Sequence, residues 1–311
     1  MTRTSVLPTL AARVPALRMF AALLRAELTR LLRNRAFLVP SLLLPVMFFA
    51  LFALPNIQGH LGGIGAGPYM LVSYAAYSLV STALFTFGVA TAAERASGWM
   101  RQLRITPISP LTYFAARIVA SLFMGLGSVL LLLLFARVSG GVSIAAGPLA
   151  LVLFRLLLGM VPFALLGLGL GLALGPAGAA PTANLINIPL MFASGIFYPL
   201  DVAPRFIQTL APYLPAYHYG QLGWTAIGAA PAGSQATHWL VLAGYSALFL
   251  TLCLWAYRRD EARRGAEQAG AEQHSLGPVC WPGSARHLPL APDSAHPGQV
   301  RAGFISEQRS S

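Results

Sequence analysis

Six apolar runs, separated by short polar stretches, occupy most of the chain between residues 36 and 257. The first run, at residues 36–54, would measure about 28 Å as an α-helix, close to the thickness of the hydrocarbon core of a bilayer. The others lie at residues 68–93, 113–136, 149–174, 184–200 and 239–257. This pattern predicts an all-α integral membrane protein with six transmembrane helices.

An amphipathic helix is predicted just before the first run. One face carries Leu17, Phe20, Leu24, Leu28, Leu31 and Leu32, and the other carries Arg18, Arg25, Thr29 and Arg33. Such a helix can lie along the inner membrane interface, with its guanidinium groups toward the lipid headgroups. Alternatively, its apolar face packs against the protein itself.

Two other segments differ from the apolar runs. Prolines interrupt residues 199–238, a stretch that is too apolar for a free loop, so short helices at or re-entering the outer surface are expected. The chain is expected to begin with a flexible N-terminus at residues 1–15. It is expected to end, at residues 260–311, in a disordered cytoplasmic tail rich in Gly, Pro, Ser and His. The transmembrane domain is then residues 16–259.

The composition excludes several kinds of chemistry. Hydrophobic residues make up 56% of the 311 residues and charged residues only 10%, which is typical of a membrane protein. All 21 basic residues are arginine, and without lysine the chain has neither a nucleotide-binding P-loop nor a Schiff-base amine. The two cysteines, Cys253 and Cys280, form no disulfide framework or metal motif, and no metal site is expected.

The arginines also indicate the orientation in the membrane. With the N-terminus inside, the inner flanks of the runs hold Arg25, Arg30, Arg33, Arg35, Arg95, Arg101, Arg104, Arg117, Arg258, Arg259, Arg263 and Arg264. The outer side holds Arg137, Arg155 and Arg205. Short arginine-rich loops stay cytoplasmic, so both termini are predicted to be cytoplasmic. Because the net charge of +12 flanks apolar runs rather than gathering on a folded face, nucleic-acid binding is not expected.

A charged, turn-forming island occupies residues 94–110, between the second and third runs. Glu94 is expected to open a short helix there, with its carboxylate near the positive end of the helix. Thr106, Pro107 and Pro110 would end that helix before the third run. Two interpretations stay open: a docking surface for a partner, or a solvated loop whose arginines only fix the topology.

The order of these features over residues 16–259 resembles the membrane subunits of ABC-2 type ATP-binding cassette exporters. The resemblance rests on the interfacial helix, Pro40 and Pro45 in the first run, the proline-broken outer segment, and island residues that include Glu94, Arg95, Gly98, Leu103, Thr106, Pro107, Tyr113 and Arg117. It implies a multi-pass subunit of a bacterial-type inner (plasma) membrane that pairs with a second copy or a related permease. It also implies a separate cytoplasmic ATP-binding cassette subunit, which uses ATP and Mg, while this chain binds no cofactor.

In that family the island forms the coupling helix that contacts the ATPase. The residues expected to carry the coupling are Glu94, Arg95, Gly98, Trp99, Arg101, Leu103, Arg104, Thr106 and Pro107. Gly98 would permit close approach of the partner, and Arg101 and Arg104 could pair with its acidic groups.

Candidate residues for a substrate pathway lie within the runs. Tyr74, Ser78, Thr82 and Thr86 recur every four residues, so their hydroxyls either face a translocation cavity or bond to neighbouring helices. Arg155 either extends to the outer headgroups or contacts an anionic substrate. The row Gly167, Gly171 and Gly175 indicates close helix packing rather than a pathway.

The expected function is the membrane half of an ATP-driven exporter of a drug-like, lipid or lipid-linked molecule. Two other classes stay open. A secondary transporter would need carboxylates inside the membrane. A membrane enzyme would need convergent polar groups, for which only Ser194 with His218 or His238 is available.

Overall fold

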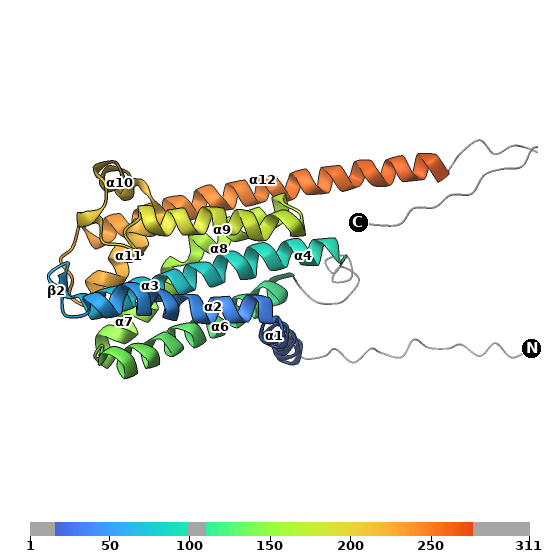
Figure 1. Cartoon of the computed structure of the whole chain (residues 1–311). Helices are drawn as coiled ribbons and strands as arrows, with labels where there is room; N and C mark the ends of the chain where they lie inside the picture. Colours follow the sequence, from blue (N-terminus) through green and yellow to red (C-terminus); the bar gives the residue numbers. More distant parts are fainter. Residues whose placement is uncertain (1–15, 99–109, 276–311) are drawn as a thin grey trace, which may run out of the picture. The chain divides into compact units, whose positions relative to one another are not determined.

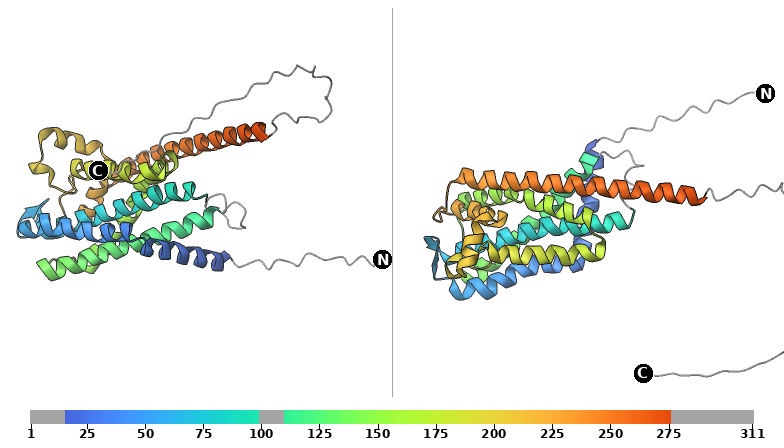
Figure 2. Two further views of the ribbon diagram at one scale, coloured as in Figure 1. Left: turned by 45° about the vertical axis from the view of Figure 1, so that its right-hand side comes forward. Right: turned by 90° about the horizontal axis from the view of Figure 1, so that it is seen from above.

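The computed structural model describes residues 16–98 and 110–275. The chain divides into two units, residues 1–264 and 265–311, and of the second unit the described part is the end of one helix. The fold of the first unit is a helix bundle, shown from three sides in Figures 1 and 2.

The long helices of the bundle correspond to the apolar runs. They are α2 (Arg35–Phe48), α3 (Ala66–Leu84), α4 (Ala90–Ala96), α6 (Pro110–Gly140), α7 (Ala146–Gly159), α8 (Val161–Ala173), α9 (Pro176–Ala193) and α12 (Gln235–Ser275). One π-helical turn, η1 (Phe49–Ala53), prolongs α2, and a second, η3 (Phe85–Val89), joins α3 to α4. Five stretches of the described chain are long and apolar enough to cross a membrane: Phe37–Asn56, Ala66–Ala96, Ala115–Gly140, Ala146–Ala173 and Gln235–Arg259. They confirm an all-α membrane protein.

The predicted run at 184–200 is misplaced. Its helix, α9, ends at Ala193, because Gly195 adopts a left-handed conformation (φ 76°) and the chain turns. The amide of Gly195 donates to Phe192 O at 3.2 Å and that of Ile196 to Met191 O at 3.1 Å, which is the Schellman arrangement that closes helices. Because α9 is not among the five stretches above, the count of six crossings stays a prediction.

Helix α3 is the centre of the bundle and is buried along nearly its whole length. Helices α2, α6, α8 and α11 (Pro215–Ala226) pack against it. The contacts of η3 and the end of α3 with α8 depend on glycine: a Cβ on Gly171 would lie 2.4 Å from Gly88 O of η3, and one on Gly167 would lie 2.9 Å from Leu84 O of α3. At Gly175 no described atom lies within 4 Å. The predicted packing row is therefore confirmed at two of its three positions.

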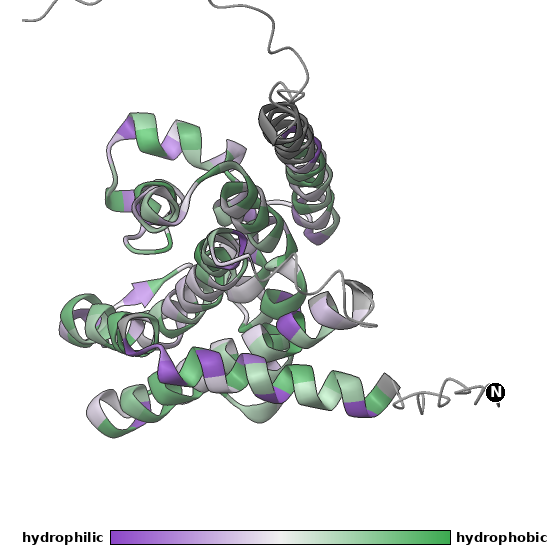
Figure 3. Ribbon diagram, turned by 90° about the vertical axis from the view of Figure 1, so that its right-hand side faces the viewer, coloured by the Kyte–Doolittle hydropathy of each residue, from purple (hydrophilic) through white to green (hydrophobic). Residues whose placement is uncertain are grey.

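Helix α1 (Ala16–Arg33) confirms the predicted amphipathic helix and lies across one end of the bundle (Figure 3). Leu31 is buried in a small cluster with Ala120 and Met124 of α6, and Leu24 and Leu28 pack against this cluster. Leu17, by contrast, is 76% exposed. The apolar face therefore packs partly on the protein itself, and its placement at a membrane interface stays a prediction.

The opposite end of the bundle carries the short elements (Figure 1). They are η2 (Leu54–Asn56), the antiparallel pair β1 (His60–Leu61) and β2 (Ile64–Gly65), η4 (Leu200–Val202), α10 (Arg205–Leu210), η5 (Ala211–Tyr213) and α11. The predicted short helices between 199 and 238 are confirmed. Helix α11 is anchored by Trp224, which stacks on Tyr69 at 4.7 Å and donates through Nε1 to Ser73 Oγ at 2.9 Å.

Helix α12 continues to Ser275, past residue 260, where the composition places the start of the tail. Alanine, glutamate, glutamine and arginine dominate residues 260–273, and these are good helix formers. Residues 1–15 and 276–311, for which flexibility is predicted, lie outside the described residues.

Candidate functional site

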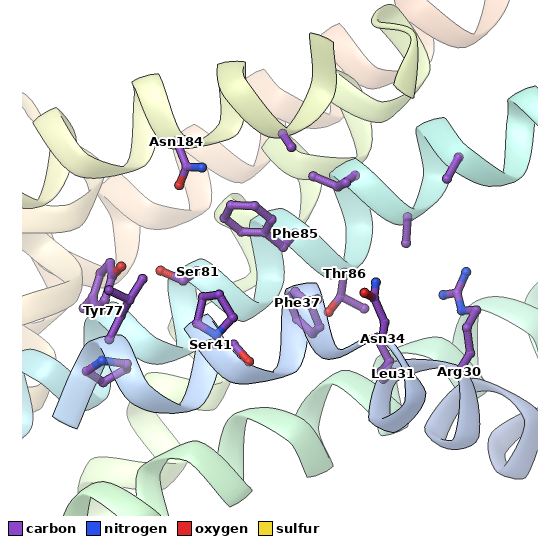
Figure 4. Close-up of a pocket in the computed structure, with 17 residues that line it drawn as sticks. Arg30, Leu31, Asn34, Phe37, Ser41, Tyr77, Ser81, Phe85, Thr86 and Asn184 are labelled. Carbon is purple, nitrogen blue, oxygen red and sulfur yellow. The ribbon is translucent and has the colours of Figure 1, made fainter. Parts of the chain in front are cut away.

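A cavity of about 530 Å³ lies between α2, α9 and the continuous helix formed by α3, η3 and α4 (Figure 4). Its walls are mainly apolar, with a few hydroxyl and amide side chains and one guanidinium group at the α1 end. The lining residues are Arg30, Leu31, Asn34, Phe37, Pro40, Ser41, Leu44, Pro45, Tyr77, Ser81, Phe85, Thr86, Val89, Ala90, Ala93, Ala180 and Asn184. This size and composition suit a drug-sized amphipathic molecule.

The α2 wall of the cavity contains two prolines, and each lacks the amide that would bond to a carbonyl four residues earlier. Pro45 thereby frees the carbonyl of Ser41. The Ser128 hydroxyl donates to that oxygen at 2.9 Å, and the Ser78 hydroxyl donates to Ser128 Oγ at 2.7 Å. These bonds link α2, α6 and α3.

Of the predicted pathway residues on α3 and η3, Thr86 lines the cavity. Tyr74, Ser78 and Thr82 are buried and do not line it. The Tyr74 hydroxyl donates to Phe197 O at 3.2 Å, and Ser78 bonds to Ser128 as described above. For Ser78 the structure therefore favours the alternative of bonding between helices.

The adjacent row Tyr77, Ser81 and Phe85 faces the cavity instead (Figure 4). This row has the same four-residue spacing and begins three positions after Tyr74, so spacing alone could not choose between the two rows. Ser81 is held by Asn187 of α9, whose Nδ2 donates to Ser81 Oγ at 2.7 Å. Sequence reasoning missed this row, together with Asn184.

At the α1 end of the cavity, charged side chains from three helices meet around Glu94. We call Glu27, Arg30, Glu94, Tyr113 and Arg117 the Glu94 cluster. Glu94 Oε2 accepts from Arg117 Nη1 at 2.6 Å and from the Tyr113 hydroxyl at 2.6 Å, and Glu94 Oε1 accepts from Arg30 Nη1. Arg30 Nη2 lies 2.6 Å from Glu27 Oε2. The cluster therefore ties α1, α4 and α6 together.

Burial determines the electrostatics of the Glu94 cluster. The Arg117 side chain is 1% exposed, and its Nε donates to Thr86 O at 3.1 Å. Burial raises the pKa of Glu27, although the nearby guanidinium of Arg30 opposes the shift. Burial is also the main reason that the pKa of the Tyr113 hydroxyl is raised. Two carboxylates and two guanidinium groups balance each other in charge.

The expectation that Glu94 opens a helix is wrong. Glu94 lies near the end of α4, and its carboxylate is buried between Arg30 and Arg117. An acid near the C-terminus of a helix is disfavoured by the helix dipole, and the two guanidinium groups compensate for this. The helix ends two residues after Glu94, at Ala96, and Gly98 beyond it adopts a left-handed conformation (φ 73°).

Of the remaining coupling candidates, Arg95 and Gly98 lie within the described residues and the others do not. Arg95 Nη1 donates to Gly171 O at 2.9 Å and also to Leu172 O, so it caps the C-terminal end of α8. Gly98 has no described atom within 4 Å of the position of a Cβ. Trp99, Arg101, Leu103, Arg104, Thr106 and Pro107 lie outside the described residues.

The family model described as "ABC-2 type transporter" matches residues 18–222, which run from α1 into α11 and contain both the cavity and the Glu94 cluster. The chain belongs to the ABC-2 type transporter family. The chain is also 26% identical over 238 residues to the "Putative transport permease YvfS" of Bacillus subtilis (strain 168), covering 76% of this chain and 96% of the relative. The chain is thus a multi-pass membrane subunit of a transporter, in a family of permeases rather than enzymes.

Arg155 of this ABC-2 subunit lies away from the cavity lining. Its Nη1 donates to Leu222 O at 3.3 Å and to Thr225 Oγ1 at 3.2 Å, both at the end of α11. A cation there is favoured by the helix dipole. Whether Arg155 also contacts substrate stays a prediction.

The serine and histidines considered for an enzyme are engaged differently in the ABC-2 subunit. Ser194 belongs to the turn that closes α9. His218 Nδ1 lies 2.8 Å from His238 Nδ1, and His218 Nε2 lies 2.9 Å from Pro212 O. The carbonyl can only accept, so His218 carries its proton on Nε2, and His238 donates to His218 through Nδ1. His218 thus bonds to Pro212 of η5 through Nε2 and to His238 through Nδ1, and the histidine pair links α11 to α12.

Proposed function

We propose that this subunit is the membrane half of an ATP-driven exporter that moves a drug-like, lipid or lipid-linked molecule out of the cytoplasm. The energy comes from a separate cytoplasmic ATP-binding cassette subunit, which uses ATP and Mg. The cavity supports the choice of substrate, because it combines apolar walls with a few polar groups such as Ser81 and Asn184.

The Glu94 cluster is the observation that carries the proposed coupling. Glu94 is the first residue of the coupling segment, residues 94–107, while Tyr113 and Arg117 follow this segment. One carboxylate therefore joins the helices on both sides of this segment, and Arg30 extends the connection to α1. A force applied to the segment by a partner would reach α1, α4 and α6 together.

Within this mechanism, the ATPase closes on ATP and pulls on the coupling segment through Trp99, Arg101, Leu103, Arg104, Thr106 and Pro107. The movement shifts the helices from inward-open to outward-open. Reversing a strongly biased equilibrium of this kind takes about 5 kcal/mol, so the connection has to be stiff. The charge-paired Glu94 cluster, in which Glu27, Glu94 and Arg117 are buried, supplies this stiffness.

The proposed orientation follows from arginine placement. The α1 end of the bundle faces the cytoplasm, both termini are cytoplasmic, and the subunit lies in a bacterial-type plasma membrane. The subunit pairs with a second copy or a related permease. In the substrate pathway, Thr86 lines the cavity, and Ser78 supports its α2 wall through Ser128, whereas Tyr74 and Thr82 are buried outside the lining.

Reconstitution tests the proposal. The purified subunit alone in liposomes should move no substrate uphill, whereas the subunit with its ATPase should do so when ATP and Mg are supplied. The control is the same complex with an ATPase variant that binds but does not hydrolyse ATP. Uphill transport by the subunit alone would refute the proposal.

A secondary transporter is the second candidate, because Glu94 is a buried carboxylate within the stretch Ala66–Ala96. Its pairing with Arg30 and Arg117 argues against ion coupling, since the cluster is already neutral. The same liposomes separate the two functions: a secondary transporter would accumulate substrate when a proton or sodium gradient is imposed in place of ATP.

A further inference from the structure

Arg30 lines the wall of the cavity (Figure 4) and also belongs to the Glu94 cluster. Its Nη1 contacts Glu94 and its Nη2 lies 2.6 Å from Glu27, while Nε and Nη2 are both buried and have no hydrogen-bond partner among the described residues. The side chain is 38% exposed, against 1% for Arg117. Of the two cations in the cluster, Arg30 is therefore the one that is partly exposed and lines the cavity.

Thr86 also contacts the Glu94 cluster and lines the cavity. Its carbonyl accepts two bonds from Arg117, and its side chain lines the cavity. Its hydroxyl has no partner in the described part of the chain, although the residue is only 1% exposed. An unused buried donor is costly unless something accepts from it.

The charge of the cavity wall has one sign. Among the residues that line it, Arg30 is the one charged side chain, and no aspartate or glutamate is present. Phe37, Leu44 and Phe85 provide apolar walls further along the cavity. A ligand that matches this arrangement has an apolar body between α2 and α9 and a hydrogen-bond acceptor, preferably anionic, at the α1 end.

We infer that the cavity binds an amphipathic anion, with a carboxylate or phosphate that is received by Arg30. This deepens the proposed function and rests on it only in taking the cavity as the substrate site. Because Arg30 also holds Glu94, the anion competes with Glu94 for the same guanidinium group. Binding therefore loosens the anchor of the coupling segment, so the segment senses whether the cavity is occupied.

The charges of the cluster determine whether each substitution raises or lowers the affinity for the anion. Glu27 and Glu94 already neutralise Arg30 and Arg117, so the attraction of Arg30 for an incoming anion is opposed by repulsion from the two carboxylates. Arg30→Gln should weaken binding of an anion, and Glu27→Gln should strengthen it. A purely structural role of the cluster predicts no such opposite effects.

Binding of dodecyl phosphate to the full-length subunit in nanodiscs of zwitterionic lipid tests the inference, with dodecanol as the uncharged probe. Arg30→Gln should lower the affinity for dodecyl phosphate about 10-fold or more and leave the affinity for dodecanol unchanged. Arg25→Gln is the matched control, because Arg25 is exposed on the same helix, outside the cavity lining, and the charge change is identical. The affinity of this control for dodecyl phosphate should stay within about twofold of the wild type, since only a screened surface charge changes.

Two further variants keep the test independent of folding defects. Glu27→Gln should bind dodecyl phosphate more tightly than the wild type, and Arg30→Lys, which retains the charge, should retain part of the affinity. Equal losses in Arg30→Gln and Arg25→Gln would overturn the inference. Competition by inorganic phosphate as strong as by dodecyl phosphate would also overturn it, because the site would then accept a free anion.

The binding assay needs no ATPase, so its failure is distinct from failure of the proposed exporter. Arg30-dependent binding without ATP-driven export would count against the exporter alone. ATP-driven export without Arg30-dependent binding would count against the amphipathic anion alone. In the complete complex, dodecyl phosphate should stimulate ATP hydrolysis by the wild type and not by Arg30→Gln.

Discussion

Replacing Glu94 by alanine should destabilise the folded subunit itself, apart from any effect on transport. Arg117 would then keep its bonds to the Thr86 carbonyl but lose its carboxylate. With the side chain only 1% exposed, water cannot replace that partner. Removing one member of a buried ion pair costs about 3–5 kcal/mol, and Tyr113 loses its acceptor as well.

Related variants separate the buried charge from a general effect of truncation. Glu94→Gln keeps an oxygen that can accept from Tyr113 and Arg117, so its cost should be smaller, about 2 kcal/mol. The double variant Glu94→Ala with Arg117→Met removes both buried charges and should be more stable than Glu94→Ala alone. Asp201→Ala removes an exposed carboxylate and should change the free energy of unfolding by about 0.5 kcal/mol or less.

The assay is equilibrium unfolding in mixed micelles with increasing denaturing detergent, followed by circular dichroism and tryptophan fluorescence. The reasoning fails if Glu94→Ala costs no more than Asp201→Ala. It also fails if the double variant is as unstable as the sum of its two single variants, because the charges would then not be coupled.

Three further predictions concern other parts of the bundle. Gly171→Ala places a Cβ 2.4 Å from a carbonyl of η3 and should cost about 1–3 kcal/mol in the same unfolding assay, whereas Gly175→Ala, with open space among the described atoms, should not. Arg155→Gln should leave the ratio of exported anionic to neutral compounds unchanged, because its partners are on α11; a selective loss of the anionic compound would indicate substrate contact. Burial lowers the pKa of His218, so the unfolded chain binds a proton near pH 6.5 before the folded chain does. Stability should therefore fall as the pH drops below about 6.5 in the wild type and less so in His218→Gln; equal slopes would contradict this.

The existence of the membrane helices could be predicted from the sequence because burial in lipid or protein requires long apolar runs. Which face of α3 borders the cavity could not be predicted from the sequence. Helix α3 is buried on all sides, so the pattern of apolar residues carries no information about which row faces which neighbour. The row of Tyr74 carries more hydroxyl groups than the row of Tyr77, Ser81 and Phe85, so polarity does not identify the row that borders the cavity; the positions of α2 and α9 determine it.

The Glu94 cluster could not be predicted from the sequence, for a related reason. Glu94 appears in the sequence beside Arg95, yet its own partners are Arg30, 64 residues before it, and Arg117, 23 residues after it. Local rules on charges near helix ends therefore suggested a helix start, while long-range pairing determined the actual position. The end of α9 is a different case, because Gly195 provided a local signal that the apolar run concealed.

The prolines of α2 connect these observations. A proline in a helix leaves a carbonyl without its usual donor, and within a membrane that oxygen has to be satisfied by protein. Ser128 donates to the Ser41 carbonyl freed by Pro45, and Ser78 donates to Ser128. Ser78 thus belongs to the polar support behind the α2 wall, while Pro40, Ser41 and Pro45 line the cavity in front of it. One carbonyl of the irregular helix that shapes the cavity is thus satisfied by the Ser128 hydroxyl, which accepts from Ser78 in turn, so the Ser78 hydroxyl, whose spacing suggests a pathway, meets a structural need.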